Sequence, residues 1–433
     1  MNDLASTRIN RRTVLGGMAA ASAALALGRP ALAQDKVKLV VLTHWGTQDQ
    51  KDVLDAIFAD YMAANPNVEV EHQTVAFADL VSRITTGQLG GDNPDIYHYY
   101  NLWMPDFVGS GLLATPPEAV VTDVTTNYGA GAVGGATYAD QLWGYPTEQN
   151  TYQLIANKAM MSEAGVATPP ATWDELKRAA EAMTKRDGDK VTQAGMMFLQ
   201  SWDTGVVHPW TSLLYSNGGE YVSADNTEVL YNQQPGIDTL NMQLDLLNSG
   251  AAMTSVLEDN DFLTGQAAMT IMANFWGADL RAGMTGGIEN VSVSPIPYTE
   301  GHDSIAVQYQ WIWGVSATTQ KAEAAWSLLQ WLNSPVDGGS SPMGNFLTTA
   351  LNAIPGRTSD QAAHEDLLGD AFVAPFVEAL KTSRTEPIIP GAAEIKTGLQ
   401  KQIESAWFGE KSAEEALNQA ADDANAILAE KGA

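Results

Sequence analysis

The residues of this chain that could take part in chemistry are mostly aromatic and acidic. In the segment YQWIWG, Tyr309, Trp311 and Trp313 occupy alternate positions and would share one face of a strand. That face could be a layer of the core, or part of it could line a ligand site. The chain has 12 tryptophans and 13 tyrosines, so aromatic side chains for such a site are plentiful.

The sequence lacks the motifs of common enzyme classes. It has no cysteine, which rules out disulfides, thiolate metal sites and cysteine nucleophiles. It has no Gly-x-Ser-x-Gly elbow, phosphate loop or dinucleotide fingerprint. The six histidines show no metal-ligand spacing, so neither a metal nor a cofactor is expected. Carboxylate pairs are numerous, and residue type alone therefore leaves a secreted glycosidase open as an alternative.

The chain is strongly acidic, with a formal net charge of −28 over 433 residues. Such a field repels nucleic acid and anionic lipid, so neither is expected as a partner. A generally acidic, soluble surface is the simplest explanation of the charge. A cationic ligand such as a polyamine is the alternative.

Residues 1–33 have the features of an export signal. The pair Arg11-Arg12 precedes the apolar run 14–27, and Ala31-Leu32-Ala33 is a small-residue cleavage site, which places the mature start near Gln34. Because the arginine pair adjoins the apolar run, a twin-arginine signal is favoured over an ordinary secretory signal. With no cysteine available for a lipid anchor, we expect a freely soluble periplasmic protein.

Strands and helices alternate along the first part of the mature chain. Residues 36–43 are an apolar, β-branched run typical of a buried strand, and residues 53–62 have helical spacing. A second strand is predicted at 68–71, a second helix at 77–89 and a third strand from residue 94. This order predicts parallel strands with crossover helices, which is an α/β fold.

More helices are predicted in the later part of the chain. Thr172 with Glu175, and Ser412 with Glu415, have the spacing of capping boxes at helix starts. Helical patterns are also found at residues 238–248, 322–332, 371–380 and 394–407.

Six segments, in order, resemble those of the extracellular solute-binding proteins of ABC transporters, in the carbohydrate-binding branch that includes maltose-binding protein. They cover nearly all of the mature chain and read FADYMAANPNVEVE, GDNPDIYHYYNLWMPDFVGSGLL, LWGYPTEQNTYQLIANKAMMSEAGVATPPATWDEL, FLTGQAAMTIMANFW, KAEAAWSLLQWLNSP and NAIPGRTS. Each segment is a weak signal alone, but six in the same order are specific.

The resemblance implies a two-lobe periplasmic-binding-protein fold, with crossing hinge strands and a ligand cleft between the lobes. By resemblance, lobe one comprises residues 34–146 plus 298–355, and lobe two comprises residues 147–297 plus 356–433. The implied function is to bind a neutral sugar or polyol, to close around it by hinge motion and to deliver it to the permease subunits in the inner membrane. No catalysis is implied, and we expect a monomer.

A sugar has apolar C–H faces and a rim of hydroxyl groups. An aromatic side chain beneath the face, with carboxylates, amides or a guanidinium group at the rim, would bind it. Ligands in α/β folds collect at the carboxyl ends of strands. With the resemblance, these arguments predict the ligand-binding residues Trp45, Gln48, Tyr100, Asn101, Glu148, Asn150, Trp202, Asp203, Asn274, Trp276, Gln310, Trp311 and Arg357.

Several of these predictions have an alternative. Trp276 is the best stacking candidate, because the resemblance is closest there. Trp45 either contacts the ligand or covers a helix start. Arg357 either reaches the cleft or only locks its own turn. Glu148 and Asn150 could also be solvated residues of the hinge.

The opening segment departs from the family pattern, because many relatives have glycines where this chain has Gln310 and Trp311. Side chains rather than bare backbone are therefore expected to fill that part of the cleft. We expect Trp311 in the cleft and Trp313 in the core.

Overall fold

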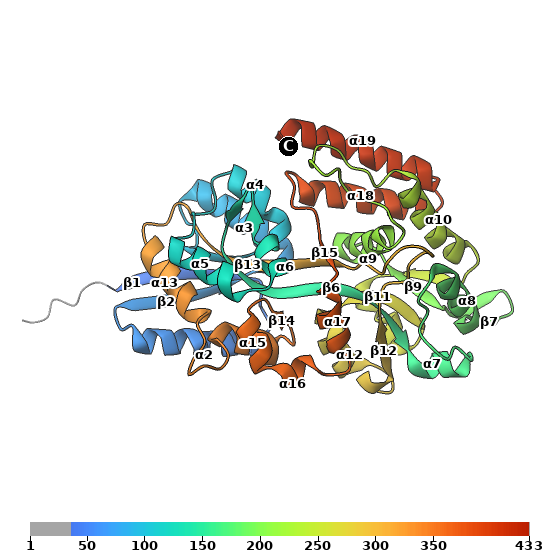
Figure 1. Ribbon diagram of the computed structural model, residues 1–433, viewed down its shortest axis with the longest axis horizontal. Helices are drawn as coiled ribbons and strands as arrows, with labels where there is room; N and C mark the ends of the chain where they lie inside the picture. Colours follow the sequence, from blue (N-terminus) through green and yellow to red (C-terminus); the bar gives the residue numbers. More distant parts are fainter. Residues whose placement is uncertain (1–35, 433) are drawn as a thin grey trace, which may run out of the picture.

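The computed structural model describes residues 36–432, and the predicted export signal lies outside this range. The described chain forms two α/β lobes joined by long strands that run from one lobe into the other (Figure 1). Within this range, no helix is both long and apolar enough to cross a membrane.

One sheet of eleven strands extends through both lobes. Its order is β10-β9-β11-β6-β13-β3-β1-β2, with β12 and β14 paired to β6 and β15 paired to β13. The bounds of these strands are β1 Val37–Thr43, β2 Val68–Thr74, β3 Ile96–Tyr100, β6 Tyr145–Asn157, β9 Met196–Leu199, β10 Ala252–Ser255, β11 Met269–Ala273, β12 Val291–Ser294, β13 Val307–Val315, β14 Ile354–Pro355 and β15 Arg384–Thr385. Two small hairpins, β4 (Thr137–Tyr138) with β5 (Gln141–Leu142) and β7 (Lys185–Asp187) with β8 (Lys190–Gln193), stand apart from it.

The two long strands β6 and β13 connect the lobes. Residues 145–151 of β6 pair antiparallel with β13, and residues 152–157 pair with β11 and β12 of lobe two. β13 in turn pairs antiparallel with β3 of lobe one. Every residue of β6 and β13 is buried. These strands therefore form the floor between the lobes rather than a solvated linker.

The remaining strands place their carboxyl ends at this junction. In lobe one, β1 is parallel to β2 and β3. In lobe two, β9 is parallel to β10 and β11. β3 runs antiparallel to β13, β11 runs antiparallel to β6, and β13 and β6 are antiparallel to each other. The parallel strands of lobe one therefore run in the opposite direction to those of lobe two. Their carboxyl ends consequently face each other across the junction.

Helices flank the sheet in both lobes (Figure 1). Lobe one carries α2 Gln48–Ala64, α3 Phe77–Gly90, α4 Met104–Gly109, α5 Glu118–Asn127, α6 Ala130–Gly135, α13 Ala322–Leu332, α14 Pro342–Asn345, α15 Thr358–Ala363 and α16 Glu365–Leu368. Lobe two carries α7 Lys158–Glu163, α8 Trp173–Met183, α9 Asp203–Tyr215, α10 Gln234–Asn248, α11 Asp261–Thr264, α12 Gly277–Gly283, α17 Ala374–Ala379, α18 Ala392–Trp407 and α19 Ala413–Lys431.

Short helical turns link several of these elements. They are the 3-10 turns η1 Asn101–Trp103, η2 Leu257–Asp259, η3 Asn274–Trp276 and η4 Ile288–Asn290, and the π-helix η5 Phe346–Ala350. Two of them, η1 and η3, directly follow strands β3 and β11 at the junction between the lobes.

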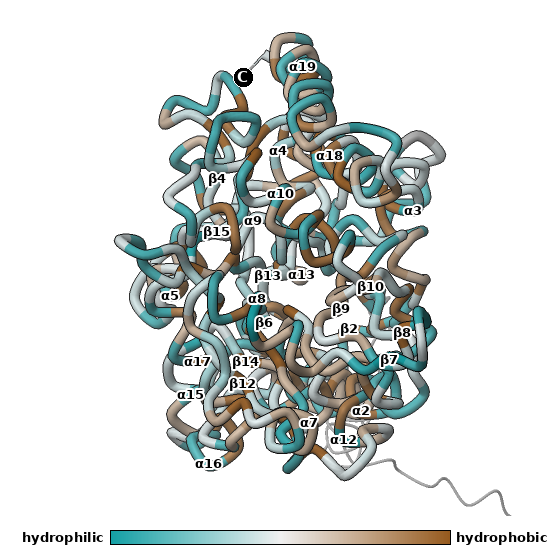
Figure 2. The backbone as a smooth tube through the Cα atoms, turned by 90° about the vertical axis from the view of Figure 1, so that its right-hand side faces the viewer, coloured by the Kyte–Doolittle hydropathy of each residue, from teal (hydrophilic) through white to brown (hydrophobic). Residues whose placement is uncertain are grey.

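The local predictions of secondary structure are confirmed at several positions. Both predicted capping boxes form, at Thr172 with Glu175 and at Ser412 with Glu415. The helix predicted at 322–332 coincides with α13, and the helix predicted at 77–89 ends one residue later. The hydropathy of the C-terminal helix α19 alternates along its length (Figure 2), because its buried face consists of alanines and two leucines.

The predicted division places residues from 356 onward in lobe two. Arg357 and Asp360 contact residues that the same division places in lobe one, since Arg357 donates to Asp123 and Asp360 accepts from Ser341. These contacts hold the start of α15 against lobe one. The division of the chain into lobes remains a prediction.

Candidate functional site

A cavity of about 410 Å³ lies between the lobes, where the carboxyl ends of the parallel strands face each other. Its walls come from lobe one, lobe two and the crossing strands. The lining residues are His44, Trp45, Gln50, Phe77, Tyr100, Glu148, Asn150, Trp202, Thr204, Phe275, Ala278, Asp279, Tyr309, Trp311, Ala350, Leu351 and Ala353.

The lobe-one wall is built from stacked aromatic rings. His44 directly follows β1, and its imidazole lies on the indole of Trp311, with ring centroids 3.8 Å apart and planes inclined by 18°. Phe77, at the start of α3, meets the same indole edge-on at 5.9 Å. Tyr100 ends β3, with its ring centroid 5.8 Å from that of Trp311. These rings give the wall a continuous apolar and polarisable surface.

The lobe-two wall has its own aromatic pair. Trp202 lies just after β9 and Phe275 lies just after β11, and their rings meet edge to face at 6.3 Å. Both side chains are half-buried, so part of each ring faces the cavity. A flat ligand held between the lobes would therefore meet aromatic side chains on both sides.

The charged side chains of the cavity wall are both acidic. Among its described lining residues, Glu148 on β6 and Asp279 on α12 are carboxylic acids, and none is a lysine or arginine. Burial raises the pKa of Asp279. Burial and the neighbouring His98 lower the pKa of His44 well below its ordinary value, so its imidazole is neutral at pH 7. The wall can hydrogen-bond hydroxyl groups or hold a cation, but it disfavours an anion.

Six of the predicted ligand-binding residues line this cavity. They are Trp45, Tyr100, Glu148, Asn150, Trp202 and Trp311. Trp45 is almost fully buried, with its ring against His98 and Phe346, and these contacts do not show the alternative in which it covers a helix start. Contact with a ligand remains a prediction for all six.

The structure contradicts the choice of Trp276 as the main stacking residue. Trp276 is buried in the core of lobe two, where it packs against Phe262 at 5.5 Å. Its chain neighbour Phe275 lines the cavity instead. The 3-10 turn η3 that follows β11 decides this, because it turns adjacent side chains in different directions.

Arg357 and Gln310 are also directed away from the cavity. The guanidinium of Arg357 donates two hydrogen bonds of 3.0 Å to the carboxylate of Asp123 and lies over the ring of Tyr128. Arg357 therefore stabilises its own turn in lobe one, which is the alternative prediction for this residue, and does not reach the cleft. The amide of Gln310 lies on the opposite face of β13 from Trp311 and donates to the carbonyl of Ala132 at 2.6 Å.

Two predicted residues support the cavity from behind it. Asn101 accepts a hydrogen bond from the backbone N–H of Gln310 at 3.2 Å. Asn274 accepts from the N–H of Thr151 at 3.0 Å and donates to the side chain of Asn150 at 3.3 Å. Both asparagines are fully buried, and they hold the crossing strands in register rather than lining the cavity.

The last two predicted residues are occupied by local hydrogen bonds. Gln48 is exposed on α2 and donates to Asp52, while Gln50, two residues later, lines the cavity. Asp203 accepts from the N–H and hydroxyl of Thr204 at the start of α9. Here again a neighbour of the predicted residue, Thr204, faces the cavity.

Sequence reasoning missed several lining residues. They are His44, Gln50, Phe77, Thr204, Phe275, Asp279 and Tyr309, together with the small or apolar Ala278, Ala350, Leu351 and Ala353. Five of the first seven lie one or two residues from a predicted site residue, and a sixth, Asp279, lies three residues from Trp276. The sequence therefore indicates the correct segments of the chain, but it does not show which side chain of each segment points into the cavity.

One group of side chains in the described chain could hold a metal ion. Donor atoms of His44, His98 and Glu148 lie within 4.8 Å of one another. His44 follows β1, His98 lies on β3 and Glu148 lies on β6. The three residues are therefore far apart in the sequence, which shows no metal-ligand spacing. His98 Nε2 is 2.9 Å from the hydroxyl of Thr147, which donates to Glu148, so these groups already have hydrogen bonds that a metal would displace.

Comparison with known proteins places the chain among binding proteins. A family model described as bacterial extracellular solute-binding protein matches residues 45–338. A protein of Brucella abortus (strain 2308), named as a binding protein, is 25% identical over 381 residues, which are 85% of this chain and 88% of the relative. The maltotriose-binding protein of Pyrococcus abyssi is 23% identical, over 84% of this chain and 76% of that protein.

Solved structures show the same architecture. The GacH receptor of Streptomyces glaucescens, studied unliganded and in complex with acarbose, superposes with a TM-score of 0.79 at 22% identity. The match covers 90% of this chain and 98% of the receptor. The predicted two-lobe α/β fold is thereby confirmed.

Proposed function

Because the chain belongs to the bacterial extracellular solute-binding protein family, we propose that it binds a neutral sugar or polyol between its lobes for an ABC importer. The observation that carries this proposal is the interlobe cavity. Aromatic rings from both lobes face it, carboxylate and amide groups stand at its floor, and no lysine or arginine is among its described lining residues. This is the surface that a sugar's C–H faces and hydroxyl rim require.

The names of similar proteins support a carbohydrate ligand. One relative is a maltotriose-binding protein, and one similar structure is a receptor that binds acarbose. In our proposal the protein works as a monomer in the periplasm, after twin-arginine export, and hands its ligand to the permease subunits in the inner membrane. It binds and releases the ligand without chemical change.

A cationic solute such as a polyamine is the second candidate. It is favoured by one observation, which is that the two charged residues of the wall, Glu148 and Asp279, are both acidic. A flexible polyamine would leave much of the aromatic surface without a matching flat face. We therefore rank it below a sugar.

Titration of the tryptophan fluorescence tests the proposed function. Trp202 and Trp311 line the cavity, so a bound ligand should change their emission. We expect saturable changes with maltose or maltotriose, or with a polyol such as sorbitol, and none with spermidine. Calorimetry on the same samples confirms stoichiometry. Binding of spermidine without any sugar or polyol would replace the sugar proposal with the cationic one.

A glycosidase would behave differently in a second assay. The purified protein should leave p-nitrophenyl glycosides intact over hours at concentrations that saturate binding. Steady turnover that is lost on substituting Glu148 or Asp279 would show that the cavity is an active site.

A further inference from the structure

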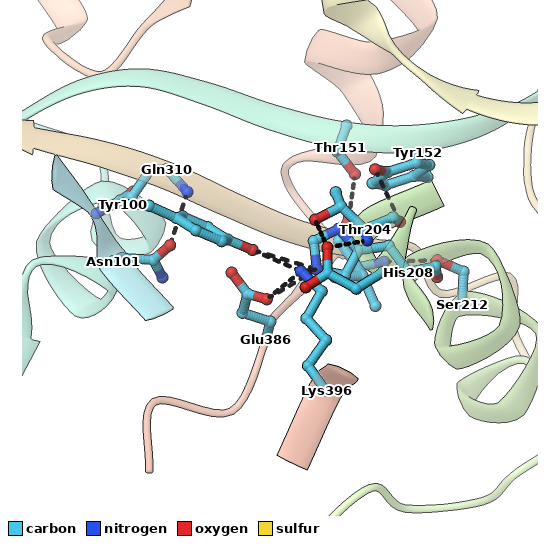
Figure 3. Close-up of polar contacts among 12 residues, drawn as sticks. Tyr100, Asn101, Thr151, Tyr152, Thr204, His208, Ser212, Gln310, Glu386 and Lys396 are labelled. Atoms are coloured by element: carbon cyan, nitrogen blue, oxygen red, sulfur yellow. Dashed lines mark hydrogen bonds and ion pairs between the residues drawn. The ribbon is translucent and has the colours of Figure 1, made fainter. Parts of the chain in front are cut away.

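Four polar side chains form a buried cluster behind the cavity (Figure 3). Tyr100 belongs to β3 of lobe one. His208 on α9 and Lys396 on α18 belong to lobe two, and Glu386 follows β15 on the chain between the lobes. Each of the four residues is at most 4% exposed. The cluster thus joins both lobes out of contact with solvent.

The ammonium group of Lys396 is at the centre of this cluster. Its Nζ atom lies 3.0 Å from the hydroxyl of Tyr100, 2.9 Å from Nε2 of His208 and 3.5 Å from Oε2 of Glu386. An ammonium group has three donors, so these three neighbours can take all of them. Nζ also lies 5.1 Å from the centroid of the Tyr100 ring.

This arrangement is costly for a chain that needs only packing at this position. Burial of an ammonium group and a carboxylate costs several kcal/mol per ion, and an apolar pair of similar volume is often at least as stable. Nε2 of His208 is also 2.7 Å from Glu386 and 3.4 Å from the hydroxyl of Tyr100, yet one imidazole nitrogen can serve only one of these partners at a time. Among the described residues, His208 Nδ1 and Glu386 Oε1 have no hydrogen-bond partner.

Tyr100 connects this cluster to the ligand cavity. Its ring is part of the cavity wall, whereas its hydroxyl points at Lys396 and His208 (Figure 3). The same ring meets Tyr309 edge-on at 5.3 Å, and Tyr309 also lines the cavity. A shift of the Tyr100 hydroxyl would therefore move the wall that the ligand touches.

The polar contacts that Asp106 of lobe one makes with the C-terminal part of the chain are more exposed. Asp106 on α4 accepts from the backbone N–H of Gly391 at 3.2 Å and from Lys431 at 3.3 Å. The Lys431–Asp106 pair is about one-third exposed, and ion pairs in water contribute about 0–1 kcal/mol. The buried cluster is thus the stronger candidate for a specific tie between α18 and the wall of the cavity.

We propose that Lys396 is a positioning residue for ligand binding. Through the hydroxyl of Tyr100 it holds the lobe-one wall of the cavity against lobe two, and Glu386 supplies the charge that keeps Lys396 buried. This inference rests on the proposed function only in taking the cavity as the ligand site. It adds a residue that does not line that site.

A double-mutant cycle on the full mature protein tests the inference. Affinity for maltotriose and melting temperature are measured for Tyr100→Phe, Lys396→Met and the double variant. Loss of a hydrogen bond to a charged group predicts about tenfold weaker binding for each single variant. The double variant should be no weaker than the weaker single variant. Lys401→Met, an exposed lysine on the same helix, is the matched control and should leave affinity unchanged.

A second pair of variants separates positioning from structural support. Lys396→Met leaves the Glu386 carboxylate buried beside the His208 imidazole but without its ammonium partner, so the melting temperature should fall. Adding Glu386→Gln should restore most of the melting temperature while the affinity stays weak, because Tyr100 is still not held. If affinity recovers together with the melting temperature, or if the effects of the cycle are additive, Lys396 is structural only and the inference is overturned.

The two proposals can fail separately. If the wild-type protein binds maltotriose but the cycle is additive, the function stands and the inference falls. If no sugar binds, the proposed function falls, and the cluster is tested without ligand.

The test without ligand measures the distance between the lobes. Because the chain has no cysteine, dyes can be attached at Ala63→Cys and Ala182→Cys, which are exposed sites on α2 and α8. The distribution of that distance should be broader, or its mean longer, in the Lys396→Met variant than in the Lys401→Met variant. An unchanged distance overturns the inference.

Discussion

Two tryptophans of β13 occupy the same face of the strand but have different surroundings. The rings of Trp311 and Trp313 both contact the imidazole of His98, at 4.9 and 4.8 Å between centroids. Trp311 reaches the cavity, whereas Trp313 is completely buried and packs edge-on against Trp45. The position of each ring along the strand, not its type, determines what it can do.

This difference leads to opposite expectations for the two alanine variants. Trp311→Ala should weaken ligand binding more than it lowers stability, because it removes part of the cavity wall. Trp313→Ala should lower the free energy of unfolding by about 3–5 kcal/mol, the usual cost of a buried aromatic, and affect affinity less. Fluorescence or calorimetric titration and urea denaturation measure the two effects. Equal losses of stability with unchanged affinity in both variants would refute the division.

At the scale of elements, the crossing strands need close backbone contact. Gly144 immediately precedes β6, and a Cβ atom added there would lie 2.1 Å from the backbone carbonyl oxygen of Trp313 on β13. That oxygen belongs to a paired strand and cannot move aside. The start of the crossover is therefore sensitive to a single added carbon.

We expect Gly144→Ala to lower the free energy of unfolding by about 1–3 kcal/mol or more, because the strands must separate to relieve the overlap. Gly134→Ala, on α6, is the matched control, since an added Cβ meets no atom within 4 Å there. The control should be neutral or slightly stabilising, because alanine suits a helix better than glycine. Similar urea midpoints for the two variants would contradict the predicted contact between the strands.

At the scale of the whole molecule, buried histidines make stability depend on pH. Burial lowers the pKa of His98 and of His208, in His208 with the help of Lys396. The unfolded chain therefore binds these protons at a higher pH than the folded protein. The stabilisation from the neutral imidazoles is complete above the ordinary histidine pKa of about 6.5 and is lost as the pH falls below it.

The free energy of unfolding should consequently decrease as the pH is lowered from 7.5 to 5.5. The slope is at most about 1.4 kcal/mol per pH unit for each histidine. Urea denaturation at several pH values measures it. His98→Gln, which removes one of these buried imidazoles, should reduce the slope. A stability that stays constant over this range would show that the buried imidazoles are accommodated in their charged forms.

The order of strands and helices in the first part of the chain, and several later helices, could be predicted from the sequence, because caps and hydrophobic periods act over a few residues. The helix at 322–332, the capping box at Thr172 and the third strand are such local features. The two-lobe fold followed from six ordered resemblances. The loops of the site were also predictable, since strand ends gather ligands in this kind of sheet.

Which side chain of each loop reaches the cavity was decided only by the tertiary structure. A shift of one residue in a turn redirects a side chain, and this separates Phe275 from Trp276 and Thr204 from Asp203. The partner of Arg357 lies 234 residues away at Asp123, and Lys396 meets Tyr100 across 296 residues. Such pairs depend on how the two lobes pack along β6 and β13, which no local pattern in the sequence encodes.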